Sequence, residues 1–216
     1  MLSLVKLNKQ LVDKWGKDKK ECIVLGNSPH INELDFEKVD SMLSVGVNRI
    51  GYKYDPDILL WADCLLFTSK GEFYPAEYRS AFHNILKTTR SKIKLCRDHP
   101  EILTTDDCIK FKTVKKYGHN WKGGLVFASA VCSSIHLAML MKIPTIYVAG
   151  VDFSTNRYFN GQIQYRSKNH KYDPSDSMDQ YKHFEMIRKA NTECEILMCS
   201  PKCDIPGFKK TDKLNV

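Results

Sequence analysis

The chain has 216 residues, 43% hydrophobic and 27% charged, which is ordinary for a globular protein and long enough for one substantial domain. No run approaches about eighteen apolar residues, and the lysine-rich N-terminus is unlike a secretory signal, so we expect a cytoplasmic protein without integral membrane association. The formal net charge of +8 fits either an ordinary solvated surface or a polyanionic partner such as DNA or a charged glycan.

Short apolar runs alternate with helical patterns along most of the chain. In chain order we expect a helix at 6–15, a strand at 22–25, a helix at 32–42, strands at 43–47 and 58–62, a helix at 75–86, strands at 92–96 and 109–112, a helix at 125–141, a strand at 144–149, a helix at 179–190 and a strand at 195–199. This alternation predicts an α/β protein with a mostly parallel sheet and helices on both faces. We expect one Rossmann-like domain over residues 1–216, with a polar and aromatic lid at 154–178.

The eight cysteines are scattered along the chain, and Cys22, Cys132 and Cys199 fall inside apolar runs. Without an export signal, buried reduced thiols are a better interpretation than a disulfide framework. Cys194, Cys199 and Cys203 lie close in sequence but form no C-x-x-C pair, so we expect no metal site there.

Two of the predicted strands stop at a glycine that small polar residues follow. Residues 21–28 read Glu-Cys-Ile-Val-Leu-Gly-Asn-Ser, and residues 145–154 read Thr-Ile-Tyr-Val-Ala-Gly-Val-Asp-Phe-Ser. A buried parallel strand presents its carboxyl end to a ligand in this way. Glycine lets backbone N–H groups approach a phosphate, and Asn27 and Asn48 suit a base edge or ribose hydroxyls. Turn capping is the alternative role of both asparagines.

Several common nucleotide and hydrolase signatures are missing. The chain has no G-x-G-x-x-G, no G-x-x-x-x-G-K-[ST] and no G-x-S-x-G, which argues against NAD binding, a P-loop and an ordinary α/β hydrolase. Asp55-Pro56-Asp57 precedes its strand instead of following it, so we interpret it as a turn. His136 falls within an apolar helical pattern and is predicted to be a hydrogen-bonded core residue.

The order of these strand ends resembles that of a known superfamily. Residues 23–29, Ile-Val-Leu-Gly-Asn-Ser-Pro, resemble the opening strand and G-N-x-P loop of small Campylobacter-type bacterial sialyltransferases, and equally of the related pterin diphosphokinase-like proteins of archaea and phages. Residues 45–48, 60–63 and 146–153 are similar to the later strand ends of the same proteins, and 196–202 to their last strand. Asn169-His170 with Asp173-Pro174 is similar to a segment of the phage relatives.

The resemblance implies a nucleotide-sugar transferase with a lid, a variant of the glycosyltransferase A-like fold. In the sialyltransferases the nucleotide is cytidine monophosphate, and no metal is needed. The residues that the resemblance and the strand ends place around the donor are Gly26, Asn27, Ser28, Asn48, Asp63, Gly124, Ser129, Gly150, Asp152, Arg157 and Arg166. We therefore expect a nucleotide sugar as co-substrate, with no cofactor and no metal.

The resemblance also suggests groups for the transfer step. His170 is the best candidate for the base that takes the acceptor's proton, because it lies in the expected lid and matches a histidine of the relatives. An exposed loop histidine without a role is the competing interpretation, and Asp173 is the second candidate base. Tyr158 is assigned to the departing phosphate, with Arg157 and Arg166 as cationic helpers.

Three functions stay open. The leading hypothesis is a glycosyltransferase with a polyanionic acceptor, such as modified phage DNA or a lipooligosaccharide. The second is diphosphate transfer to a pterin, with magnesium held by Asp63, Asp152 and Asp173, and the third is a non-catalytic nucleotide-binding module. Ser154 stands where the sialyltransferases would have a tyrosine, which leaves the donor open. The sequence indicates neither the sugar nor the oligomeric state.

Overall fold

The structure is a computed structural model that describes residues 19–62, 76–100, 102–114, 124–126, 129–152, 159, 174–191, 193–200, 202–203 and 205–216. Within these ranges, eight strands form one sheet in which all neighbours run parallel. They are β1 (Glu21–Leu25), β2 (Leu43–Val47), β3 (Ile58–Trp61), β4 (Ile93–Arg97), β5 (Cys108–Phe111), β8 (Thr145–Ala149), β9 (Glu195–Met198) and β10 (Lys209–Lys210). β6 (Thr113–Val114) and β7 (Leu125–Val126) pair separately.

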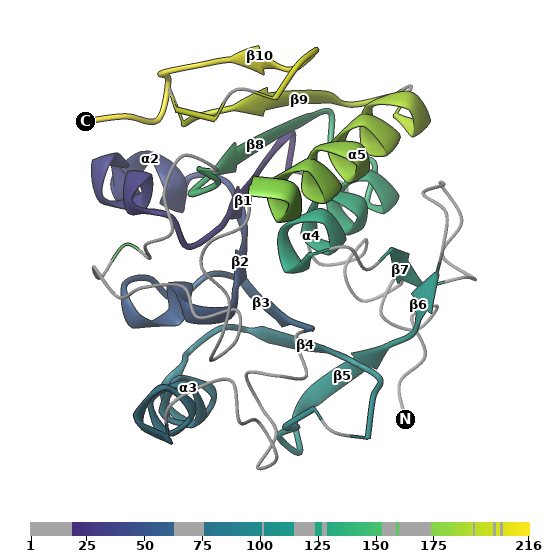
Figure 1. Ribbon diagram of the computed structural model, residues 1–216. Helices are drawn as coiled ribbons and strands as arrows, with labels where there is room; N and C mark the ends of the chain where they lie inside the picture. Colours follow the sequence, from purple (N-terminus) through teal and green to yellow (C-terminus); the bar gives the residue numbers. More distant parts are fainter. Residues whose placement is uncertain are drawn as a thin grey trace.

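The strand order of the sheet is β10-β9-β8-β1-β2-β3-β4-β5. The chain builds outward from β1 to β5 in one direction, and then β8, β9 and β10 are added on the other side of β1 (Figure 1). The order therefore reverses between β1 and β8. In open α/β sheets, ligands bind outside the carboxyl ends of the strands at such a switch point.

Helices cover both faces of the sheet, as the alternating pattern predicts (Figure 1). One face carries α4 (Ala130–Leu140) and α5 (Pro174–Ala190), and the other carries α2 (Phe36–Asp40), α3 (Ala76–Thr88) and the 3₁₀ turns η2 (Pro29–Glu33) and η3 (Asn48–Tyr52). Because side chains alternate along a strand, β1 supplies both cores: Val24 packs with Ile135 of α4, whereas Ile23 belongs to the cluster of Phe82 of α3.

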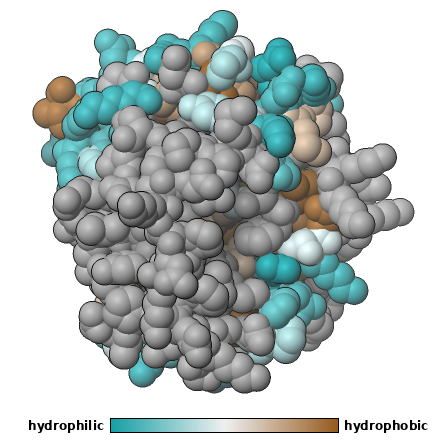
Figure 2. All heavy atoms as spheres, viewed as in Figure 1, coloured by the Kyte–Doolittle hydropathy of each residue, from teal (hydrophilic) through white to brown (hydrophobic). Residues whose placement is uncertain are grey.

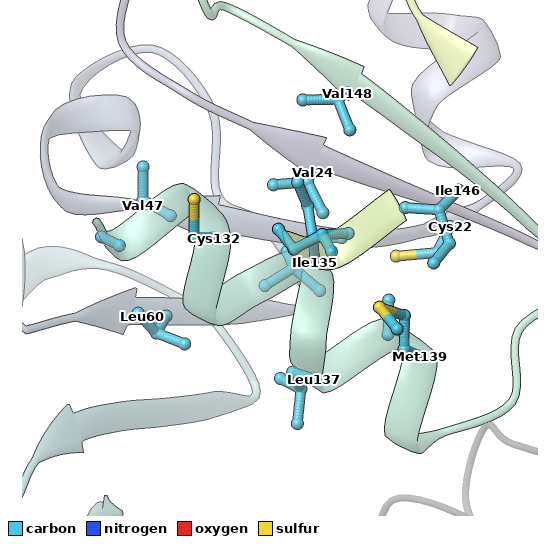
Figure 3. Packing of buried hydrophobic residues seen from close by; sticks show 14 of the residues in the cluster. Cys22, Val24, Val47, Leu60, Cys132, Ile135, Leu137, Met139, Ile146 and Val148 are labelled. Atoms are coloured by element: carbon cyan, nitrogen blue, oxygen red, sulfur yellow. The ribbon is translucent and has the colours of Figure 1, made fainter. Parts of the chain in front are cut away.

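Helix α4 lies directly on the centre of the sheet. Figure 3 shows Cys132, Ile135 and Met139 of this helix facing the side chains of β1 and its neighbours. The helix begins at Ala130 instead of residue 125, because Leu125 and Val126 pair with β6. His136 is 1% exposed and its Nδ1 accepts the Val126 N–H at 3.1 Å, which confirms the predicted core histidine.

The other predicted elements agree closely with the structure, with two corrections. The helix expected at 32–42 is wrong: η2 and α2 replace it, because Leu34 is extended and bridges Asn215, and Asp35 caps α2 by accepting the Glu37 N–H at 3.1 Å. Helix α5 begins at Pro174, so residues 174–178, assigned to the lid, are helical. The expected helix at 6–15 and the rest of the lid except Phe159 lie outside the described residues.

The Asp55-Pro56-Asp57 segment lies in the irregular connection before β3, with a bend at Asp57, and it precedes the strand as predicted. The Asp57 carboxylate accepts the backbone N–H of Ser44 at 3.1 Å and pairs with Lys92 at 2.8 Å. Asp55 accepts the backbone N–H of Arg90 at 3.0 Å. These carboxylates therefore hold the amino ends of β3 and its neighbours, at the edge opposite the carboxyl ends.

The cysteines within the described ranges are all free thiols, and they are buried as predicted except for Cys108 and Cys194, which are partly exposed. In the same part of the chain, no three His, Cys, Asp or Glu side chains are grouped as metal ligands would be. None of the described helices combines the length and apolar character needed to cross a lipid bilayer. In the view of Figure 2, the described surface is mostly hydrophilic, with brown residues in small groups.

Lys213 ties the C-terminal segment to the start of β1. Its Nζ donates to Glu21 Oε1 at 2.6 Å and to the Tyr147 hydroxyl at 2.8 Å, and that hydroxyl also donates to Glu21 at 2.8 Å. The hydrogen bond from Lys213 lowers the pKa of Glu21, and the carboxylate in turn raises the pKa of Lys213. The cluster is therefore strongest while Glu21 is ionised and Lys213 is protonated.

Replacing Lys213 with methionine is expected to lower the free energy of unfolding at pH 7 by about 0.5–1 kcal/mol, the range of partly exposed ion pairs. The lowered pKa of Glu21 contributes stability that is lost as pH falls below its ordinary value of 4.5. The raised pKa of Lys213 contributes stability that is lost as pH rises beyond 10.5. Urea unfolding of the unchanged protein and of Lys213→Met should show that their difference in free energy of unfolding becomes smaller towards both acidic and alkaline pH. Lys142→Met, which removes an exposed 4.0 Å pair, is the control, and a gap independent of pH would contradict the prediction.

Candidate functional site

A pocket of about 180 Å³ lies where the carboxyl ends of β1, β2 and β8 meet the start of α4. The residues that line it are Asn27, Ser28, Val47, Asn48, Ser129, Ala130, Val131, Gly150, Val151 and Asp152. It therefore lies at the switch point of the sheet, where the topology predicts a ligand. This volume is smaller than the roughly 300–1,000 Å³ of pockets that enclose a whole drug-sized ligand.

The loop after β1 is held against the loop after β8 by two backbone hydrogen bonds. Gly26 N–H donates to the Ala149 carbonyl at 2.8 Å, and Ser28 N–H donates to the Gly150 carbonyl at 2.9 Å. A Cβ on Gly26 would lie 2.2 Å from the Gly150 oxygen, and Gly150 has a φ of +67°. Both glycines are needed for this close approach, because any side chain would push the loops apart.

Three buried side-chain oxygens around the pocket have no hydrogen-bond partner among the described residues. They are Asn27 Oδ1, Ser28 Oγ and Asn48 Oδ1. Ser28 is only 4% exposed. Leaving a buried polar atom unpaired costs about 1–3 kcal/mol, so three together are typical of a site that a polar ligand completes.

Asn48 also adopts an uncommon backbone conformation. Its φ of +49° lies in the left-handed region, which non-glycine residues avoid and asparagine tolerates best. This conformation ends β2 and starts η3. Backbone strain of this kind often occurs at ligand sites, where the surrounding structure holds the residue in place.

The N-terminus of α4 faces the same pocket. Ser129 is its N-cap and its Oγ accepts the Cys132 N–H at 3.2 Å, while Ala130 and Val131 line the pocket. The first N–H groups and the positive end of the helix dipole favour an anion such as a phosphate. Asp152 lines the same pocket, and its carboxylate has the charge opposite to that of the helix N-terminus. A phosphate is therefore favoured beside α4, and hydroxyl or amino groups of a ligand are favoured beside Asp152.

His30 lies in η2, directly after the β1 loop, and its side chain is buried. It is 3% exposed, its Nε2 lies 3.2 Å from Asn215 Oδ1, and burial lowers its pKa, so the ring is neutral at pH 7. The C-terminal segment holds η2 as well, since Val216 N–H donates to the Glu33 carbonyl at 2.9 Å. Sequence reasoning missed His30, because no local pattern shows that a loop histidine is buried.

Phe159, from the predicted lid, forms hydrogen bonds with the segment that follows β1. Its N–H donates to the Asn27 carbonyl and its carbonyl accepts from Asn32 Nδ2, both at 2.9 Å. The side chain packs against the core on the α3 face of the sheet. One residue of the expected lid therefore contacts the pocket loop directly.

The structure brings together most of the predicted donor residues that it describes. Asn27, Ser28, Asn48, Ser129, Gly150 and Asp152 line one pocket, and Gly26 shapes its loop. Gly124 is not among the lining residues and lies against the Lys112 backbone. Asp63, Arg157, Tyr158, Arg166, His170 and Asp173 lie outside the described residues. The apolar lining residues Val47, Ala130, Val131 and Val151 were not predicted, since apolar positions beside strand ends look like ordinary core.

No protein-family model matches the chain, and no curated protein matches its sequence. Among solved structures, it is similar to the monofunctional α-2,3-sialyltransferase Cst-I of Campylobacter jejuni, with a TM-score of 0.52 and 15% identity over 93% of this chain and 82% of that one. It is also similar to C. jejuni CstII in complex with cytidine-5′-monophosphate, with a TM-score of 0.52 and 13% identity over 91% and 87%.

A further CstII structure, in complex with the substrate analogue CMP-3FNeuAc, matches with a TM-score of 0.50 and 12% identity over 88% of this chain and 85% of that one. These matches extend over most of both proteins, although fewer than one residue in six is identical. They confirm the fold that the strand-end motifs predict. The chain has the α/β fold of the small Campylobacter sialyltransferases.

Proposed function

We propose that this protein is a glycosyltransferase that moves a sugar from a nucleotide-activated donor to an acceptor hydroxyl without a metal ion. The observation that carries the proposal is the pocket with three buried, unpaired side-chain oxygens at the switch point of the sheet. The fold supports it, because CstII is a sialyltransferase whose solved complexes include CMP and CMP-3FNeuAc.

The residue types in the pocket suit the parts of a nucleotide sugar. The amide oxygens of Asn27 and Asn48 accept hydrogen bonds, which suits ribose hydroxyls or the amino group of a base. The Ser28 hydroxyl can donate to a phosphate, and the N-terminus of α4 adds N–H groups and a favourable dipole. The donor would thus lie with its phosphate between Ser28 and α4.

The transfer step needs a base and a group that stabilises the departing phosphate. We assign the role of base to His170, with Asp173 as the second candidate. We assign stabilisation of the departing phosphate to Tyr158, with help from Arg157 and Arg166. The hydrogen bonds between Phe159 and the Asn27 loop support the assignment of Tyr158, its neighbour in sequence. Asp63, which follows the carboxyl end of β3 in sequence, is assigned to donor binding.

A thermal-shift comparison tests the donor class directly. A ligand that binds only the folded protein raises its melting temperature in proportion to RT ln(1 + [L]/Kd). Stabilisation by CMP or UDP supports the transferase, whereas stabilisation by ATP with magnesium alone would favour the pterin diphosphokinase reaction. Binding of CMP or UDP without slow hydrolysis of any nucleotide sugar, followed by mass spectrometry, would favour a non-catalytic module. No response to any nucleotide would overturn the proposal.

His170→Ala is expected to reduce transfer by roughly 10²–10⁴-fold while leaving nucleotide affinity nearly unchanged, because a general base acts only in the transition state. Initial rates with a nucleotide sugar and calorimetric titration with the nucleotide measure the two effects separately. His83→Ala is the matched control, since His83 lies on α3 and does not line the pocket. Full activity of His170→Ala would eliminate His170 as the base.

For the acceptor, we propose a polyanion, on the basis of the net charge of +8. Modified phage DNA and lipooligosaccharide are the two classes to compare. Transfer to such an acceptor should weaken steeply with added salt, whereas donor hydrolysis in water should change little. Equal salt dependence of the two reactions would argue against a polyanionic acceptor.

A further inference from the structure

Two cysteine thiols meet on neighbouring strands, and neither lines the nucleotide pocket. Cys96 of β4 and Cys108 of β5 have their Sγ atoms 3.3 Å apart. In the strand register, Cys96 is beside Lys110 and Cys108 is beside Lys94. Because residues two apart share a face, both thiols lie diagonally on one face of the sheet.

The two thiols differ in their access to solvent. Cys96 is fully buried in the core on the α3 face, whereas Cys108 is only half-buried and packs at its border. Of the two residues, Cys108 is therefore the one in contact with solvent. The arrangement places a partly exposed cysteine in contact with a buried one.

We propose that Cys96 and Cys108 form a reversible oxidation site for peroxides, in which Cys108 reacts first and Cys96 closes an intramolecular disulfide. This is a modification site separate from the pocket of the proposed transferase.

Both steps balance with hydrogen peroxide as the oxidant. The Cys108 thiolate attacks one peroxide oxygen, the O–O bond breaks, and Cys108 sulfenic acid forms as hydroxide leaves and takes up a proton to give water. The Cys96 sulfur then attacks the Cys108 sulfur, the S–S bond forms, and the sulfenic hydroxyl leaves as water with the proton of Cys96. Two electrons pass from the thiols to the peroxide, and a dithiol reductant, which is itself oxidised to a disulfide, returns Cys96 and Cys108 to thiols.

The proton distribution supports this order. The hydrogen bond from the Cys96 thiol lowers the pKa of Cys108 to about 7, and the charge of Lys110 acts in the same direction. The same hydrogen bond and burial raise the pKa of Cys96. Cys108 is thus the more readily ionised of the two thiols, and Cys96 keeps the proton that the second step releases.

The disulfide would close a ring around the segment between β4 and β5. Within it, the Leu103 carbonyl accepts the indole N–H of Trp61 at 2.9 Å, at the end of β3. The Asp98 N–H donates to the Phe111 carbonyl at 2.7 Å. Oxidation would therefore restrain a segment that holds the last residue of β3.

The test uses the full chain, treated with a small excess of hydrogen peroxide, alkylated with iodoacetamide and digested with trypsin without reduction. Trypsin cleaves after Lys94, Arg97 and Lys110, so the disulfide joins peptide 95–97 to peptide 98–110. We expect this pair, lighter than the two separate peptides by two hydrogen atoms, and its loss on treatment with dithiothreitol. Recovery of both peptides separately, with both thiols alkylated, would overturn the proposal.

Two variants separate the roles of the thiols. In Cys96→Ser the sulfenic acid on Cys108 has no partner, so dimedone should label Cys108 at least about tenfold faster than Cys194, a thiol whose pKa burial raises. Cys194→Ser should form the 96–108 disulfide as fast as the unchanged chain. Equal labelling of Cys108 and Cys194, or a disulfide through another cysteine, would overturn the proposal even if one variant folds poorly.

Discussion

Replacing Gly26 with alanine is expected to lower the free energy of unfolding by about 1–3 kcal/mol and to weaken nucleotide binding at least about tenfold. The new Cβ would lie 2.2 Å from the Gly150 carbonyl oxygen. The backbone fixes the positions of both the new Cβ and the carbonyl oxygen, so neither can rotate away and the β1 and β8 loops must separate. That separation lengthens the hydrogen bond from Ser28 N–H to the Gly150 carbonyl and opens the pocket floor. Urea unfolding and calorimetric titration with CMP measure the two losses.

Gly207→Ala is the matched control for this experiment. Gly207 has a positive φ, of +83°, which Gly26 does not, and the nearest atoms to an added Cβ belong to the flexible side chain of Arg188, at 3.0 Å. We expect a cost of roughly 1–2 kcal/mol from the backbone conformation and no change in nucleotide affinity. If Gly26→Ala matched Gly207→Ala in both measurements, the close contact between the loops would have no role in binding.

Asn48→Gly is expected to separate stability from binding. Glycine adopts the φ of +49° without strain, and the substitution removes a buried oxygen that has no partner in the described structure. The free energy of unfolding should therefore stay constant or rise by up to about 1 kcal/mol. Nucleotide affinity should fall roughly five- to tenfold, because one ligand hydrogen bond is lost.

Lys142→Gly is the control for Asn48→Gly, because Lys142 is the other non-glycine residue with a positive φ, of +57°, in the described part of the chain. Lys142 follows α4 and does not line the pocket. The Lys142→Gly variant should therefore gain a similar free energy of unfolding, with unchanged nucleotide affinity. Asn48→Asp keeps the shape and an acceptor oxygen but adds a negative charge, which is expected to repel the phosphate of the donor. Undiminished binding by both Asn48 variants would remove Asn48 from the site.

The two experiments examine different features of one pocket. Gly26 acts through backbone geometry, which fixes where the loop amides point, whereas Asn48 acts through a side chain that has an unsatisfied polar group. Sites that keep unpaired groups for a ligand are commonly less stable than they could be. A gain in stability joined to a loss of binding at Asn48 would therefore identify a functional residue more clearly than a loss of both.

Local patterning was sufficient to predict seven of the eight strands of the sheet and where they end, but not the short edge strand β10. The runs around Val24 and Val148 are β-branched, apolar and bounded by glycine, and short buried strands have this composition wherever they occur. The same local signal predicted that Asn27, Ser28, Gly150 and Asp152 follow such strands. Because parallel strands place their carboxyl ends at one edge, their meeting in one pocket could be expected as well.

Contacts between segments far apart in sequence determined the helix bounds, the burial and the side-chain contacts that local patterning did not predict. Leu34 is extended because Asn215 pairs with it, and α4 starts late because Leu125 pairs with Thr113, so both helix predictions were too long. Burial of His30 and the contact between Cys96 and Cys108 likewise depend on which segments become neighbours. Propensity acts over a few residues, whereas pairing and burial depend on partners far along the chain, and only the folded arrangement determines them.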